Sequence, residues 1–104
     1  MSDAPPFRFL FVGDIVGKPG REVLRRALPG LVARDAVGLV IANVENSAAG
    51  FGVTPDIAHE LFEYGVHVMT GGNHTWDKKE ILPYFAEQPC LLRPANMPAG
   101  TPGR

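Results

Sequence analysis

The sequence of 104 residues has one cysteine, no long apolar run and no cluster of like charges. A single cysteine, Cys90, excludes an intramolecular disulfide and is typical of a reducing compartment. We expect it to be a small apolar residue buried in the core rather than a nucleophile. The apolar runs are far shorter than the roughly 20 residues of a membrane-spanning helix. A net charge of −1, spread along the chain, argues against binding to long nucleic acids. These absences favour a soluble, cytoplasmic protein without a membrane segment.

The amino-terminal residues lack the basic start and apolar stretch of a secretory signal. We expect residues 1–6 to be a disordered leader and residues 7–104 to form a single small domain.

Apolar runs of strand length alternate with segments of helical periodicity. The first two runs are continuous, which is typical of strands buried on both faces. We expect a turn at 17–20. Because Pro29 falls inside the first helical pattern, the helix should kink or restart there. Residues 47–52 are expected to form a loop that could move. The predicted strands are 7–12, 37–42 and 66–70, with a candidate fourth at 90–92, and the predicted helices cover 23–32, 55–64 and about 78–85.

Two of these helices carry recognisable ends. Thr54 is the expected N-cap of the second helix, Pro55 takes its first position, and Gly65 ends it. Asp77 is the expected N-cap of the third. The order of elements predicts an α/β fold, a parallel sheet flanked by helices.

Polar residues follow three of the predicted strands. Asp14 follows the first strand, Glu45 and Asn46 follow the second, and Asn73 and His74 follow the third. Parallel strands end at one rim of a sheet, where open α/β sheets bind their ligands. Carboxylate, amide and imidazole donors together suit Mn, Fe, Mg or Zn. Two such ions would polarise a phosphoryl oxygen and activate water, with Glu45 able to bridge them.

Each residue also has an ordinary interpretation. Asp14 could cap a helix or a turn, and Gly72-Asn73-His74 could be a turn with an exposed histidine. Glu45 is harder to explain in this way, because it follows a strand with no basic neighbour to compensate its charge.

The remaining candidates favour structural roles. His59 is expected on a solvated helix face, His67 in the core, and Trp76 near the rim, where stacking on a base is a weaker alternative. The glycine spacing around Lys18 does not fit a Walker A loop. A serine hydrolase with serine after Gly-Asp is excluded because Ile15 stands in the nucleophile position.

Four ordered motifs closely resemble the YmdB-like branch of the calcineurin-type metallophosphoesterases, over nearly the whole chain beyond residue 6. They are Phe-Val-Gly-Asp-Ile-Val-Gly at 11–17, Asn-Val-Glu-Asn-Ser-Ala-Ala-Gly-Phe-Gly at 43–52, Gly-Asn-His-Thr-Trp-Asp-Lys-Lys-Glu-Ile at 72–81, and Arg-Pro-Ala-Asn at 93–96 with Gly-Thr-Pro-Gly at 100–103.

The resemblance implies a metallophosphoesterase-like fold, two divalent metal ions and hydrolysis of 2′,3′-cyclic nucleotides or similar phosphodiesters. It implies that Asp14, Glu45 and Asn73 bind metal, with Glu45 in the bridging place. His74 would protonate the leaving oxygen or steady the phosphorane charge, so His74 and Glu45 are the catalytic candidates. Asn46 would support the metal shell or the substrate.

The sequence departs from the family in length. Family chains are longer and supply further metal-binding histidines, whereas this sequence has only three histidines in all. We therefore expect the N-terminal part of the fold, with one metal ion or none bound by this chain alone. A non-catalytic metal- or nucleotide-binding module, or a site completed by another chain in a homo-oligomer, stays open.

Overall fold

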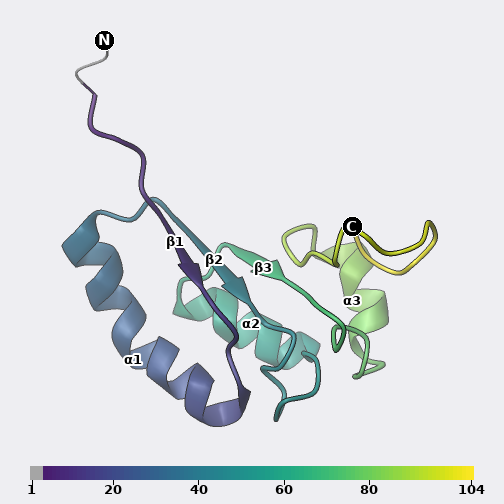
Figure 1. The fold of residues 1–104 in the computed structure, drawn as a ribbon. Helices are drawn as coiled ribbons and strands as arrows, with labels where there is room; N and C mark the ends of the chain where they lie inside the picture. Colours follow the sequence, from purple (N-terminus) through teal and green to yellow (C-terminus); the bar gives the residue numbers. More distant parts are fainter. Residues whose placement is uncertain (1–3) are drawn as a thin grey trace.

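The computed structural model describes residues 4–104, which form a three-stranded parallel sheet with helices packed beside it (Figure 1). The predicted α/β class and parallel pairing are confirmed. The elements in chain order are β1 (Phe9–Val12), α1 (Gly17–Asp35), β2 (Leu39–Asn43), α2 (Pro55–Tyr64), β3 (Val68–Thr70) and α3 (Ile81–Glu87).

The predicted leader is only partly covered by the structure. Residues 1–3 lie outside the described residues, so their predicted disorder stays a prediction. Residues 4–6 are exposed and precede β1 without forming a helix or a strand. Among the helices of the described chain, none is long and apolar enough to cross a membrane.

The register of the sheet aligns the carboxyl ends of all three strands. The order is β1-β2-β3, with Val12 opposite Ala42 and Asn43 opposite Thr70. The segments that leave the three strands therefore start at one rim (Figure 1). This common rim is the structural basis for any site assembled from residues distant in sequence.

His67 extends the pairing of β2 with the segment that enters β3. Its Nδ1 accepts a hydrogen bond from the Val40 N–H at 2.9 Å, and its own N–H donates to the Val40 carbonyl oxygen at 2.9 Å. The residue is exposed, so the prediction of a core histidine was wrong. The imidazole nitrogen thus takes the place of a main-chain carbonyl oxygen as the hydrogen-bond acceptor, next to the pairing of β2 with β3.

One face of the sheet carries the core. Val40, Ala42 and Met69 are buried together with side chains of α1 and α2. On β1, by contrast, Phe9 is 63% and Phe11 54% exposed. The prediction that β1 is buried on both faces was therefore wrong for the described chain, because β1 is an edge strand and nothing covers its phenylalanine side.

Helix α1 begins earlier than its apolar pattern suggests. The predicted turn at 17–20 is instead its first turn, which starts at Gly17 with a positive φ of 59° and an N–H donated to the Asn46 carbonyl at 3.0 Å. The helix does not restart at Pro29 but runs on to Asp35. Pro29 is exposed, and water can solvate the carbonyl that its ring leaves unpaired.

Helix α2 has the predicted ends. The Thr54 Oγ1 accepts a hydrogen bond from the Ile57 N–H at 3.2 Å, and Pro55 takes the first turn. Gly65 ends the helix with φ of 116°, a left-handed conformation that glycine adopts without strain. Ala58 and Leu61 lie fully buried on its inner side.

The last third of the chain is less regular than predicted. Helix α3 begins at Ile81, so Asp77 is not its N-cap, and the candidate fourth strand is a single parallel bridge between Met69 and Leu91. Cys90 is only partly buried, which corrects its expected place in the core. Beyond Arg93 the described residues form no further helix or strand, as expected.

The α2 cap generates a stability prediction. Thr54→Ala removes the acceptor for the Ile57 N–H and should lower the free energy of unfolding by about 1 kcal/mol. Thr54→Ser keeps the hydroxyl and should lose much less. Urea denaturation followed by circular dichroism would measure both, and equal losses for Ala and Ser would contradict the capping role.

Candidate functional site

The first two strand ends are joined by a hydrogen bond between predicted site residues. Asp14 lies two residues after β1, and its Oδ1 accepts from the Asn46 Nδ2 at 2.8 Å. The Asn46 backbone is fixed as well, because its carbonyl accepts the Gly17 N–H that opens α1. The structure thus brings together Asp14 and Asn46, as the rim argument predicts.

The second and third strand ends meet at Glu45. The Glu45 Oε2 accepts the His74 N–H at 3.4 Å, a long hydrogen bond. The carboxylate also lies directly against Gly72, where a Cβ would overlap both of its oxygens and its carboxyl carbon. Gly72 is therefore a steric requirement for Glu45 to reach this side of the rim.

The turn after β3 is held by Thr75, whose side chain is fully buried. Its Oγ1 accepts the Gly72 N–H at 2.7 Å and donates to the Gly72 carbonyl at 2.7 Å. The Asn43 Nδ2 donates to the neighbouring Gly71 carbonyl at 3.4 Å, which ties the end of β2 to the same turn. Glu45 and the turn are consequently fixed relative to each other.

His74 is oriented by a carboxylate. Its Nδ1 lies 2.8 Å from the Asp77 Oδ2, and both side chains are 37% exposed. The Phe51 ring stands edge-on to the imidazole, with ring centroids 6.0 Å apart and an interplanar angle of 87°. With Nδ1 bonded to Asp77, the Nε2 atom is the one left to face a ligand.

Asp77 and Phe51 are the contacts that the sequence interpretation missed. The sequence predicts Asp77 as a helix cap, but its carboxylate is bonded to His74 instead. The spacing of three residues within a Gly-Asn-His turn is the signal that could have indicated this pairing. Phe51 gave no comparable signal, because its place beside His74 depends on how the loop 47–52 folds.

The loop 47–52 is confirmed as a loop and is closed on itself. The Gly52 N–H donates to the Glu45 carbonyl at 2.6 Å, and the Ala48 N–H donates to the Gly52 carbonyl at 2.9 Å. The Arg21 Nη1 of α1 donates to the Ser47 carbonyl at 2.5 Å. This network holds the backbone of Glu45 while leaving Phe51 57% exposed.

Asn73 is the predicted site residue that no side-chain hydrogen bond joins to the others in the described chain. It is exposed, and within residues 4–104 its side chain makes no hydrogen bond with Asp14, Glu45 or Asn46. His59 is exposed and pairs with Glu63 at 3.0 Å, as expected for a solvated helix face. Trp76 lies beside the turn and donates its Nε1–H to the Pro102 carbonyl at 3.1 Å.

The side chains at the rim offer donor atoms of the types that bind hard divalent cations. Carboxylate oxygens of Asp14 and Glu45 and the amide of Asn46 are ligands that such cations prefer. Across the described part of the chain, however, no group of three or more histidine, cysteine, aspartate or glutamate side chains is arranged to hold a metal ion. The rim therefore offers donor atoms of a suitable chemistry, without a complete set of ligands for a metal ion among the described residues.

Comparison with known proteins identifies the family. The model of the YmdB-like protein family matches residues 10–104. The chain belongs to this family. A relative from Bacillus subtilis strain 168, named 2′,3′-cyclic-nucleotide 2′-phosphodiesterase, is 47% identical over 97 residues, which are 93% of this chain and 37% of that protein.

Two solved structures share the fold. A hypothetical protein from Thermus thermophilus has a TM-score of 0.86 and 42% identity, and a novel phosphatase from Mycoplasma pneumoniae has a TM-score of 0.88 and 34% identity. Each match covers 94% of this chain, but only 38% and 36% of the two longer chains. The chain thus spans less than two fifths of the length of these relatives.

The contact between Gly72 and Glu45 generates a prediction for stability. Gly72→Ala should cost about 1–3 kcal/mol, because the new methyl group displaces the Glu45 carboxylate. Gly13→Ala is the matched control, since a Cβ at Gly13 meets nothing within 4 Å.

A double-mutant cycle isolates the steric cause. Glu45→Ala should relieve most of the cost of Gly72→Ala, giving a coupling energy of roughly 0.5–3 kcal/mol in urea denaturation. Strict additivity of the two substitutions would show that Gly72 is required for another reason.

Proposed function

We propose that this chain contributes the catalytic rim of a metal-dependent phosphodiesterase that hydrolyses 2′,3′-cyclic nucleotides or similar small phosphodiesters. The observation that carries the proposal is the convergence of Asp14 with Asn46, and of Glu45 with His74, at one rim. The family match and the name of the Bacillus relative support the same class of reaction. The substrate is small, and no long nucleic acid is required.

In this proposal the oxygen donors hold divalent metal ions, either Fe, Mn, Mg or Zn. Asp14, Glu45 and Asn73 would bind the ions, and Asn46 would orient the Asp14 carboxylate through the hydrogen bond at 2.8 Å. The bound ions supply charge neutralisation and polarise the phosphoryl group. Because the shell formed by the described residues is partial, further donors must come from other polypeptide.

His74 would move the proton. Its Nδ1 is bonded to Asp77, which holds the imidazole ring in place and leaves Nε2 as the ring nitrogen that can act on a ligand. When a cyclic phosphodiester opens, the leaving oxygen needs a proton, and His74 would donate it from Nε2. The Phe51 ring packs edge-on against the imidazole and restricts its movement further.

A non-catalytic module that binds a metal ion or a nucleotide is the second candidate. The absence of a three-residue histidine, cysteine or carboxylate cluster in residues 4–104 favours it for this chain acting alone. Both candidate functions use the same rim residues, but only the phosphodiesterase hydrolyses its ligand.

Manganese binding tests the assignment of the rim. Calorimetric titration of the chain with Mn²⁺ should show binding that Glu45→Gln weakens by about tenfold or more, because even indirect loss of ligand support costs roughly 10–100-fold. Glu63→Gln, a change in a carboxylate that is 66% exposed on α2, is the matched control and should have no effect.

Hydrolysis of 2′,3′-cyclic AMP in the presence of Mn²⁺ separates the two candidates. Turnover that Glu45→Gln abolishes supports the phosphodiesterase, and Mn²⁺ binding without turnover supports the module. Turnover that survives Glu45→Gln would refute the metal site at this rim.

A further inference from the structure

Three cationic side chains line one cavity beside the loop 47–52. Lys18 and Arg21 lie three residues apart near the start of α1, and therefore on one side of that helix, while Lys78 comes from the segment between β3 and α3. The cavity has a volume of about 310 Å³. Its other lining residues are uncharged: Ala48, Ala49, Thr54 and Ile57. We call this cavity, with its three cations, the basic pocket.

Two of the three cations have no carboxylate partner. The arginines further along α1 each pair with a carboxylate of the same helix. Lys18 and Lys78, by contrast, form no ion pair within residues 4–104. Cations that share a cavity repel one another, and a negatively charged ligand would remove that repulsion.

Arg21 is the fixed member of the basic pocket. Its side chain is only 16% exposed, and its Nη1 donates to the Ser47 carbonyl. The Arg21 Nε is buried and makes no hydrogen bond in the described chain, because the nearest carboxylate oxygen, Glu60 Oε2, lies 3.7 Å away. A buried charged donor without an acceptor is costly. Arg21 is thus a positioned cation whose charge is only partly compensated.

The amino-terminal ends of two helices add to the positive charge of the basic pocket. Lys18 lies in the first turn of α1, which contains no acidic residue, and Thr54 is the N-cap of α2. Asp56, in the first turn of α2, is exposed and does not line the pocket. Each helix start carries about half a positive charge, so a lysine there is unfavourable and an anion is favourable.

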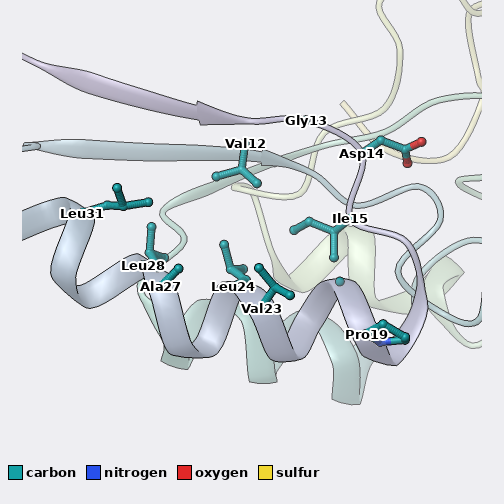
Figure 2. A pocket seen from close by; sticks show the side chains of 11 residues that line it. Val12, Gly13, Asp14, Ile15, Pro19, Val23, Leu24, Ala27, Leu28 and Leu31 are labelled. Carbon is teal, nitrogen blue, oxygen red and sulfur yellow. The ribbon is translucent and has the colours of Figure 1, made fainter.

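A second cavity of the molecule has the opposite character. It lies between β1 and α1 and has a volume of about 450 Å³. Figure 2 shows Val12, Leu24 and Leu31 pointing into it, while the Asp14 carboxylate points away. No lysine or arginine of the described residues lines this apolar cavity. A binding site for an anion is therefore expected at the basic pocket and not here.

The basic pocket adjoins the rim without sharing a lining residue with it. Lys78 directly follows Asp77, whose carboxylate is bonded to His74. Lys18 lies in the first turn of α1, the turn whose opening N–H is bonded to the Asn46 carbonyl. None of the predicted rim residues lines the pocket. A ligand in the pocket would consequently leave the rim side chains free.

We propose that the basic pocket binds phosphate, either as the free anion or as the terminal group of a nucleotide. Two ammonium groups and a guanidinium match the several oxygens and the double negative charge of a phosphate monoester. The volume of about 310 Å³ lies at the lower end of the range for small-molecule sites. This second site goes beyond the phosphodiesterase function and requires no metal ion at the rim.

Titration with inorganic phosphate, followed by heteronuclear NMR on the metal-free chain, tests the proposal. The amide signals of Lys18, Ala49 and Lys78 should shift saturably. Sodium chloride at the same ionic strength is the control for screening. Adenosine 5′-monophosphate should compete with phosphate, and adenosine should not. A higher affinity for the nucleotide than for phosphate identifies a nucleotide as the ligand, whereas an affinity no higher identifies the free anion.

Three substitutions locate the site. Lys78→Gln should weaken phosphate binding by roughly tenfold, because one charge-assisted contact is lost. Lys79→Gln is the matched control, since Lys79 is the adjacent lysine, is exposed and does not line the pocket. Glu45→Gln, at the rim, should also leave phosphate binding unchanged, which separates this proposal from the metal site. Neither lysine forms an ion pair in the described chain, so neither lysine variant is expected to unfold it.

Three results would overturn the proposal. The first is the lack of any saturable shift beyond that caused by sodium chloride. The second is equal weakening of phosphate binding by Lys78→Gln and Lys79→Gln. The third is a response confined to Asn46 and His74 and lost in Glu45→Gln, which would place the anion at the rim.

Discussion

The parallel pairing of β1, β2 and β3 is the constraint on which the candidate site depends. Because the three strands run in the same direction and in a matched register, the segments that follow them begin at one rim. Asp14, Glu45 and His74 are far apart in the sequence and have no local reason to meet. A change in register of one strand would reverse the faces of its side chains and separate these groups.

Small residues and short hydrogen-bonded turns then fix the positions of the rim side chains more closely than the sheet alone does. Gly72 lacks the side chain that would displace Glu45, and Thr75 closes the turn from a fully buried position. The loop 47–52 holds the Glu45 backbone through the Gly52 N–H, which donates to the Glu45 carbonyl. The acidic side chain is thus positioned by contacts with uncharged groups, one of which is the His74 N–H that its Oε2 accepts.

Local signals were sufficient for much of the fold. Thr54 and Gly65 define the ends of α2 through interactions within a few residues, and the sequence predicted both. The predictions failed where the outcome depended on distant neighbours. Gly17 begins a helix and donates its N–H to the distant Asn46 carbonyl, and Asp77 bonds His74 while α3 begins only at Ile81.

The same distinction between local signals and distant contacts applies to the candidate site. The sequence predicted that Asp14, Glu45, Asn46 and His74 share a rim, since strand direction alone decides this. It could not predict that Asn73 is exposed, or that Phe51 lies beside His74. Both depend on the path of turns whose conformation is set by backbone hydrogen bonds rather than by an apolar pattern.

The hydrogen bond from Trp76 to the Pro102 carbonyl links the rim to the last residues of the chain. Trp76 is the single tryptophan of the sequence, and it lies two residues from His74. Its intrinsic fluorescence is consequently a native optical probe of this one corner of the molecule. Ligand binding at the rim and release of the carboxyl-terminal segment can both be followed there without any label.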